Sequence, residues 1–143
     1  MRVTKPGGRA LVIAFGSLQK AEFLTVFIGA IRTAIPGFTG PSMETPPLPF
    51  QVADPEKLRQ EPAEAGLKQI RVEAVNWSME FRSAAHMWDM VTSNNPIGAG
   101  MVAKLTEDQK AGVRSVLDGL LRERSRDGLA ILNTEVNIGV GTK

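Results

Sequence analysis

The sequence predicts an α/β fold in which about three strands are flanked by helices. Three observations carry this prediction. Residues 10–15 form a continuous apolar run, residues 23–31 repeat apolar side chains at helical spacing, and residues 129–142 alternate in the manner of a strand. With 143 residues, of which 43% are hydrophobic, the chain can bury one core, so we predict a single domain over residues 1–143.

The first strand is expected to follow a tight turn. Lys5–Gly8 has the sequence Lys-Pro-Gly-Gly, which suits a type II turn because proline fixes φ and glycine accepts a positive φ. The run Ala10–Phe15 is then typical of a strand that is covered on both faces, as in a parallel sheet. Such a strand requires neighbours on both edges.

Two helices and a long loop are expected next. Ser17 is a plausible N-cap for an amphipathic helix over residues 18–35, which Pro36 and Gly37 end. The proline-rich residues 36–53 predict an irregular loop. Asp54 and Pro55 then begin a short helix that stops at Gly66, and Pro62 is expected to kink it.

A long strand is predicted over residues 69–81, with its apolar side chains changing face near residue 75 as a bulge would cause. A helical insert at about residues 82–127 follows. It comprises a helix capped by Ser83 that breaks at residues 94–96, and a longer helix that begins with a capping box at Thr106 and Gln109.

The last predicted strand begins after a turn at Asp127–Gly128 and covers residues 129–142. Its even-numbered residues from 130 to 140 are expected on one face, with Gly139 and Gly141 on the other.

Composition removes several classes of function. The net charge of +2, from 17 basic and 15 acidic residues, and the absence of tyrosine give no reason to expect a nucleic-acid partner. Without cysteine and with one histidine, the chain has no thiolate metal site, and we expect no metal. No apolar run approaches the length of a membrane span, so we expect a cytoplasmic protein without a membrane partner.

In their order, these elements resemble the C-terminal half of class I S-adenosylmethionine-dependent methyltransferases. The turn and strand at Lys5–Phe15 resemble the family's approach to its fifth strand. The segment Asp54–Leu67, with its Asp-Pro-x-x-Leu start and Ala-Gly-Leu end, resembles the helix before the sixth strand. The segment Asn133–Gly141 resembles the seventh strand.

The resemblance implies the C-terminal half of a Rossmann-like sheet, in which the last strand is antiparallel and lies between the other two. It also implies what the chain lacks, since the family's glycine-rich cofactor turn lies between a strand and a helix. Gly98–Gly100 is expected in a loop, and Gly139–Gly141 has no helix after it. We therefore assign no cofactor-binding residue, and expect S-adenosylmethionine to bind only if a partner chain or a missing N-terminal half completes the site.

Candidate site residues follow from this arrangement. Phe15 and Ser17 lie at the carboxyl end of the first strand, where open α/β sheets place ligands, although a helix cap is the commoner role for a serine in the position of Ser17. Met87 and Trp88 belong to a cluster that suits either an adaptable apolar substrate pocket or a core. His86 is the candidate general base, and an ordinary helix residue is its alternative.

Three functions are compatible with the sequence. The chain is the substrate-side portion of a methyltransferase and inactive alone, a non-catalytic module that associates with itself, or a binding protein for small apolar ligands. The edge of the strand Ala10–Phe15 is the expected contact with either a second copy or the missing half, because an apolar open edge tends to pair. Dimers or larger oligomers are therefore expected.

Overall fold

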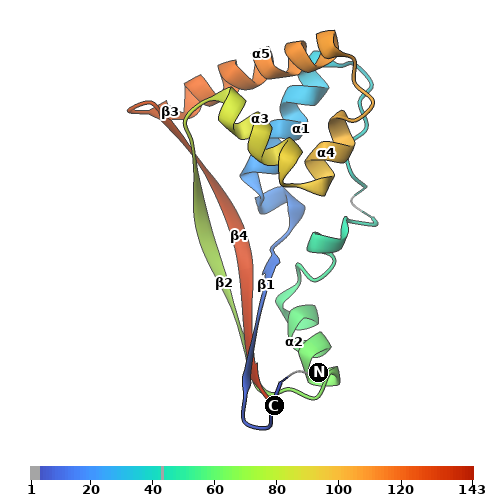
Figure 1. Cartoon of the computed structure of the whole chain (residues 1–143), viewed down its shortest axis with the longest axis vertical. Coiled ribbons are helices and arrows are strands. Elements are labelled where there is room, and N and C mark those ends of the chain that lie inside the picture. Colours follow the sequence, from blue (N-terminus) through green and yellow to red (C-terminus); the bar gives the residue numbers. More distant parts are fainter. Residues whose placement is uncertain (1–3, 43) are drawn as a thin grey trace. The chain divides into compact units, whose positions relative to one another are not determined.

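The computed structural model describes residues 4–42 and 44–143, which form an α/β structure with a four-stranded antiparallel sheet and five α-helices (Figure 1). The strands and helices, including two short 3-10 helices, follow in the order β1 (Arg9–Phe15), η1 (Leu18–Lys20), α1 (Glu22–Ala34), η2 (Leu48–Phe50), α2 (Pro55–Glu64), β2 (Lys68–Phe81), α3 (Ala84–Ser93), α4 (Pro96–Val102), α5 (Glu107–Arg124), β3 (Ser125–Arg126) and β4 (Leu129–Thr142).

The sheet has the order β1-β4-β2, and the short β3 also pairs with β4 (Figure 1). β4 runs antiparallel to β1 in a register that places Arg9 opposite Thr142 and Phe15 opposite Val136. The expectation that the last strand is antiparallel and lies between the two others is confirmed. Because β4 opposes both neighbours, β1 and β2 run in the same direction without touching.

The prediction that β1 is covered on both faces in a parallel sheet is wrong for this structure. Among the strands of the described chain its neighbour is the antiparallel β4, and its other edge is open. Leu11 and Ile13 are 62% and 56% exposed. A continuous apolar run indicates that both faces are hydrophobic, but it does not ensure that each face has a covering layer.

The turn before β1 has the predicted geometry. Gly7 has φ +77°, and the Gly8 amide donates to the Lys5 carbonyl at 2.9 Å, which closes the four-residue turn. The same turn is bonded to the last residue of the chain, since the Gly7 amide donates to the Lys143 carbonyl at 2.8 Å and the Lys143 amide donates to the Gly8 carbonyl at 2.9 Å.

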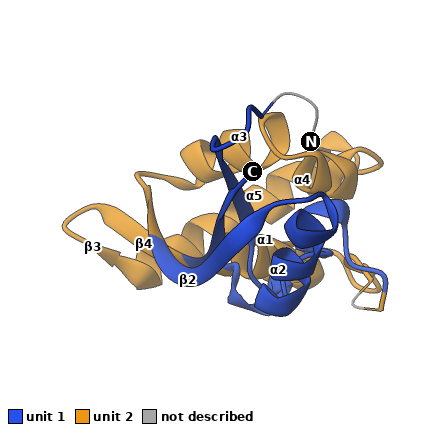
Figure 2. Ribbon diagram, turned by 90° about the horizontal axis from the view of Figure 1, so that it is seen from below, with its two compact units in different colours: residues 1–21, 45–77, 134–143 blue, residues 22–44, 78–133 orange. Residues whose placement is uncertain are grey.

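The chain divides into two compact units, which Figure 2 distinguishes by colour. Unit 1 comprises residues 1–21, 45–77 and 134–143, and unit 2 comprises residues 22–44 and 78–133. Unit 1 therefore holds β1, η1, η2, α2 and the adjoining parts of β2 and β4, while unit 2 holds the other four α-helices.

In unit 1, α2 packs on the face of β4 that carries glycine. Asp54 caps the helix by accepting from the Glu56 amide at 2.9 Å, as predicted, and Leu58 is 2% exposed. A Cβ built on Gly139 would lie 3.6 Å from Leu58, and one on Gly141 would lie 3.1 Å from Leu67. A Cβ on Gly139 would thus be in ordinary contact with Leu58, whereas one on Gly141 would be crowded by Leu67 and Ile70, so glycine is needed for close packing only at Gly141.

In unit 2, α1 packs against α5, and α3 packs against α4 and α5. Phe27 of α1 contacts Trp88 of α3, with ring centroids 5.6 Å apart. The capping box predicted for α5 is present, since Thr106 accepts from the Gln109 amide and the Gln109 side chain accepts from the Thr106 amide. Among the described helices none is long and apolar enough to cross a membrane.

The sequence predicts which residues share a face of β2 and of β4, but it does not predict which face is buried at the end of β4. On β2 the less exposed positions change from Ile70 and Val72 to Val75 and Met79, which agrees with the expected change of face. On β4 the buried residues are even-numbered up to Val136, but Asn137, Gly139 and Gly141 are buried beyond it. Ile138 and Val140 lie on the face opposite Gly139 and Gly141, as predicted, and are only half-buried, because α2 covers the glycine face.

Two helix predictions need correction. The helix expected from residue 18 is broken, because Ala21 adopts φ −93° and ψ 80° and forms a β-bridge with Thr134 between η1 and α1. Gly98–Gly100, expected in a loop, lies inside α4, whose N-cap Asn95 accepts from the Ile97 amide at 2.9 Å. The Asn-Asn-Pro sequence that ends α3 therefore also begins α4.

Candidate functional site

The open face of β1 and β4 in unit 1 is the principal candidate surface. Cross-strand partners share a face, so the pairs Leu11–Val140 and Ile13–Ile138 form one apolar stripe opposite the glycines that α2 covers. Exposure of two large aliphatic side chains side by side is unusual for a sheet, since such faces normally bury against another layer.

A groove of about 280 Å³ lies at the carboxyl end of β1. Phe15 stacks on Phe50 of η2, with centroids 5.2 Å apart and ring planes at 21°. Trp77 also lines the groove and is 60% exposed. The remaining lining is apolar as well: Val12, Ile13, Ala14, Pro49, Val52 and Val136. Phe15 thus lines an apolar groove at the strand end, and its role in substrate binding stays a prediction.

Ser17 lies just beyond this strand end, at the N-cap of η1, and its side chain makes no capping hydrogen bond. The preceding Gly16 donates its amide to the Glu135 carbonyl at 2.8 Å, and a Cβ on Gly16 would lie 2.7 Å from the Glu135 carboxylate. Lys20 pairs with the same carboxylate at 2.7 Å. Glu135 therefore fixes the backbone around Ser17.

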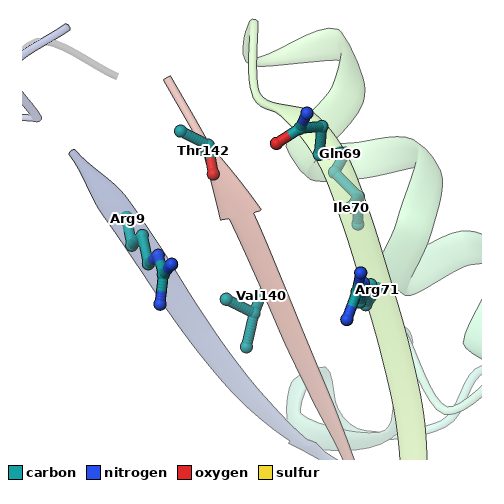
Figure 3. A pocket seen from close by; sticks show the side chains of 6 residues that line it. All are labelled: Arg9, Gln69, Ile70, Arg71, Val140 and Thr142. Atoms are coloured by element: carbon teal, nitrogen blue, oxygen red, sulfur yellow. The ribbon is translucent and has the colours of Figure 1, made fainter. Parts of the chain in front are cut away.

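A second hollow, of about 480 Å³, lies at the opposite end of the open face (Figure 3). Its lining comes from the start of β1, the start of β2 and the end of β4, and comprises Arg9, Gln69, Ile70, Arg71, Val140 and Thr142. Figure 3 shows Val140 on the strand between those that carry the two arginines. The sequence alone does not predict this hollow, because single arginines in strands form no motif.

The three remaining predicted site residues lie in unit 2. Met87 is fully buried and Trp88 is 5% exposed, with the Arg114 guanidinium 4.4 Å from the centre of the Trp88 ring. His86 is exposed; its Nδ1 accepts from the Arg82 amide at 3.4 Å, and its ring lies 5.8 Å from that of Phe81. The surroundings of Met87 and Trp88 are those of core residues, and their role in substrate binding stays a prediction.

In the part of the chain that the structure describes, no group of three or more histidine, aspartate or glutamate side chains is placed to hold a metal ion. No protein-family model and no curated protein matches this chain. The features of the chain that bear on its function are therefore the strand order, the open face and edge of β1, and the chemistry of the two hollows.

Proposed function

We propose that this chain is the acceptor-side half of a class I S-adenosylmethionine-dependent methyltransferase. The observation that carries the proposal is the strand order β1-β4-β2 with a reversed central strand. The family resemblance implies this order for its fifth, seventh and sixth strands. The Lys-Pro-Gly-Gly turn precedes β1, and the helix begun by Asp54 and Pro55 precedes β2, where the resemblance requires them.

The open edge of β1 supports a missing neighbour. The Gly16 amide and the Gly8 carbonyl both bond to β4, so even-numbered residues of β1 point their backbone groups toward β4. By the antiparallel alternation, Arg9, Leu11 and Ile13 point theirs toward the open edge. This row of backbone donors and acceptors beside an apolar stripe is the surface that a fourth strand and its covering layer would complete.

The chain's own glycines do not fit a cofactor site. Gly98 and Gly100 lie inside α4, and α2 with Leu67 occupies the space beside Gly139 and Gly141. Cofactor binding therefore belongs to the other half. What the present residues supply is the apolar groove at Phe15, which would exclude water and orient an acceptor group, and orientation accounts for much of the rate in such transfers.

The test is reconstitution. A reading frame adjoining the coding sequence that encodes a strand, a Gly-x-Gly-x-Gly turn and a helix would be coexpressed with the chain, and S-adenosylhomocysteine binding measured by titration calorimetry. We expect a one-to-one complex that binds saturably, and no binding by the 143-residue chain alone. If the two products fail to associate, or the chain alone binds S-adenosylhomocysteine, the proposal is wrong.

A matched pair of variants locates the contact. Ile13→Pro removes an amide that points to the open edge and leaves the pairing with β4 intact, because proline is tolerated at such edge positions. Ile13→Val preserves both the amide and a β-branched side chain. Association should be lost in the first variant and kept in the second.

The same edge favours a second candidate, a module that pairs with its own copy. The outward groups of Arg9, Leu11 and Ile13 can bond to a second β1 around a two-fold axis. Light scattering distinguishes the methyltransferase half from the self-pairing module. A dimer that Ile13→Pro converts to a monomer, without S-adenosylhomocysteine binding in any reconstitution, would favour the module.

A further inference from the structure

The hollow between the ends of β1, β2 and β4 has a lining that suits an anion. Two of its six lining side chains are guanidinium groups, Gln69 and Thr142 add neutral donors, and no carboxylate is among the six. Arginine binds phosphate and carboxylate through paired N–H donors of matching geometry, so two arginines around one hollow favour a negatively charged ligand.

Neither guanidinium group is bonded to another protein group among the described residues. Across residues 4–42 and 44–143, the Arg9 and Arg71 side chains form no ion pair or hydrogen bond with a protein group, in contrast to Arg59 and Arg122, which pair with Glu56 and Asp118. Both arginines are exposed at the hollow. Their donors are therefore available to a ligand.

The backbone at the hollow is also unusual. Gln69 has φ +51°, a left-handed conformation that is costly for a residue other than glycine, in the second position of β2. It follows Gly66, which ends the α2 turn with φ +88°. Strained backbone of this kind is concentrated at ligand sites, and here it places the Gln69 side chain on the rim that carries Arg71.

The hollow continues into an apolar surface. Val140 is part of its lining and is the cross-strand partner of Leu11, and the next pair along the same face is Ile13 with Ile138. A ligand with its charge at the arginines therefore has aliphatic side chains along the rest of its length. Inorganic phosphate has no apolar part and would contact only the arginines.

We propose that Arg9 and Arg71 bind the phosphate or carboxylate of a small amphipathic anion, whose apolar part lies over Val140 and Leu11. This site is at the amino end of β1, whereas the groove assigned to a methyl acceptor is at the carboxyl end, so the two proposals can fail separately. The apolar part matters because about two buried methylene groups correspond to a tenfold gain in affinity.

The experiment is a calorimetric titration of the full chain with hexyl phosphate and, separately, with inorganic phosphate. We expect saturable binding of hexyl phosphate at least tenfold tighter than that of phosphate. Equal affinity for the two would overturn the amphipathic ligand, and the absence of saturable binding would overturn the site.

Three charge-removing variants keep the test specific. Arg9→Gln and Arg71→Gln should each weaken hexyl phosphate binding about tenfold, as expected for a lost charge-assisted hydrogen bond. Lys57→Gln removes the same charge from α2, outside the hollow, and should bind as the wild type does. A loss in Lys57→Gln equal to that in Arg71→Gln would show that only net charge attracts the anion and would overturn the site.

Circular dichroism tests whether each variant still folds. The replaced side chains are exposed and the hollow is open, so the folded spectrum should be unchanged. Leu11→Asn supplies an independent check, since it should weaken hexyl phosphate and leave inorganic phosphate unaffected. Equal effects on the two ligands would count against the apolar contact.

Discussion

The Asn137 side chain donates through Nδ2 to the Ala53 carbonyl at 2.7 Å and so joins β4 to the residue before the cap of α2. Asn137 is fully buried, and its Oδ1 has no hydrogen-bond partner among the described residues. One half of the amide thus stabilises the approach to α2, while the other half carries an uncompensated desolvation cost.

Substitutions at Asn137 should separate these two effects. Asn137→Leu removes the unpaired acceptor but also the bond to Ala53, and should lower the free energy of unfolding by about 1–3 kcal/mol. Asn137→Asp replaces the donor with an oxygen facing the carbonyl and buries a charge, so its loss should be larger. Urea unfolding at pH 7 measures both values. An aspartate variant as stable as the wild type would contradict this account.

Two glycines in α4 provide a matched pair. A Cβ on Gly98 would overlap the Val91 carbonyl oxygen, whereas nothing lies within 4 Å of one on Gly100. Gly98→Ala should therefore force α4 away from α3 and destabilise unit 2 by about 1–3 kcal/mol or more. Gly100→Ala should stabilise the helix by up to about 1 kcal/mol. Thermal unfolding of the two variants should shift in opposite directions.

The capping box of α5 yields a third prediction. Thr106→Ala leaves the Gln109 amide without its acceptor and should cost about 1 kcal/mol. Ser115→Ala, at an exposed position of the same helix, should be neutral or slightly stabilising because alanine has the higher helix propensity. Chemical unfolding compares them, and an equal effect of both changes would mean that the cap contributes nothing.

The pKa of Glu107 should depend measurably on its neighbour Lys110. Lys110 donates a hydrogen bond of 2.7 Å to its carboxylate, and this bond, together with the lysine charge, lowers the pKa of Glu107. Because the folded state binds the proton less tightly than the unfolded state does, this contribution is present above the unfolded pKa and is lost as the pH falls through the folded pKa.

NMR titration of the Glu107 carboxyl carbon measures this effect. Lys110→Gln should raise the pKa of Glu107 toward its ordinary value, while Lys104→Gln, which is absent from the groups that perturb Glu107, should leave it where it is in the wild type. If the pKa of Glu107 is unchanged in Lys110→Gln, the hydrogen bond from Lys110 is not the cause of the lowered pKa.

The boundaries of most elements follow from local chemistry. Gly7, Asp54, Ser83, Thr106 and Asp127–Gly128 all act within four residues of the sites where they turn or cap the chain, so the sequence alone places them. The alternation of residues 129–142 likewise predicted β4 to the residue.

The errors concern partners that are remote in sequence. The even-numbered residues of β4 from Ala130 to Val140 are apolar except Thr134, yet α2 packs on the opposite face, where Leu58 lies next to Gly139. The same limit explains the hollow at Arg9 and Arg71, which depends on three strand ends meeting. Phe15, by contrast, lines a groove at the strand end where the sequence placed it, and whether it binds a substrate stays a prediction.

The hydrogen bonds between Gly7, Gly8 and Lys143 have a practical consequence for engineering. The amino-terminal turn and the carboxyl terminus are neighbours in unit 1, so a short linker could close the chain into a ring. Reopening it at Asp127–Gly128, an exposed hairpin turn with positive φ at both residues, would give a circular permutant with new ends in unit 2. Labels or fusion partners attached to the new ends of that permutant would lie far along the sequence from the edge of β1.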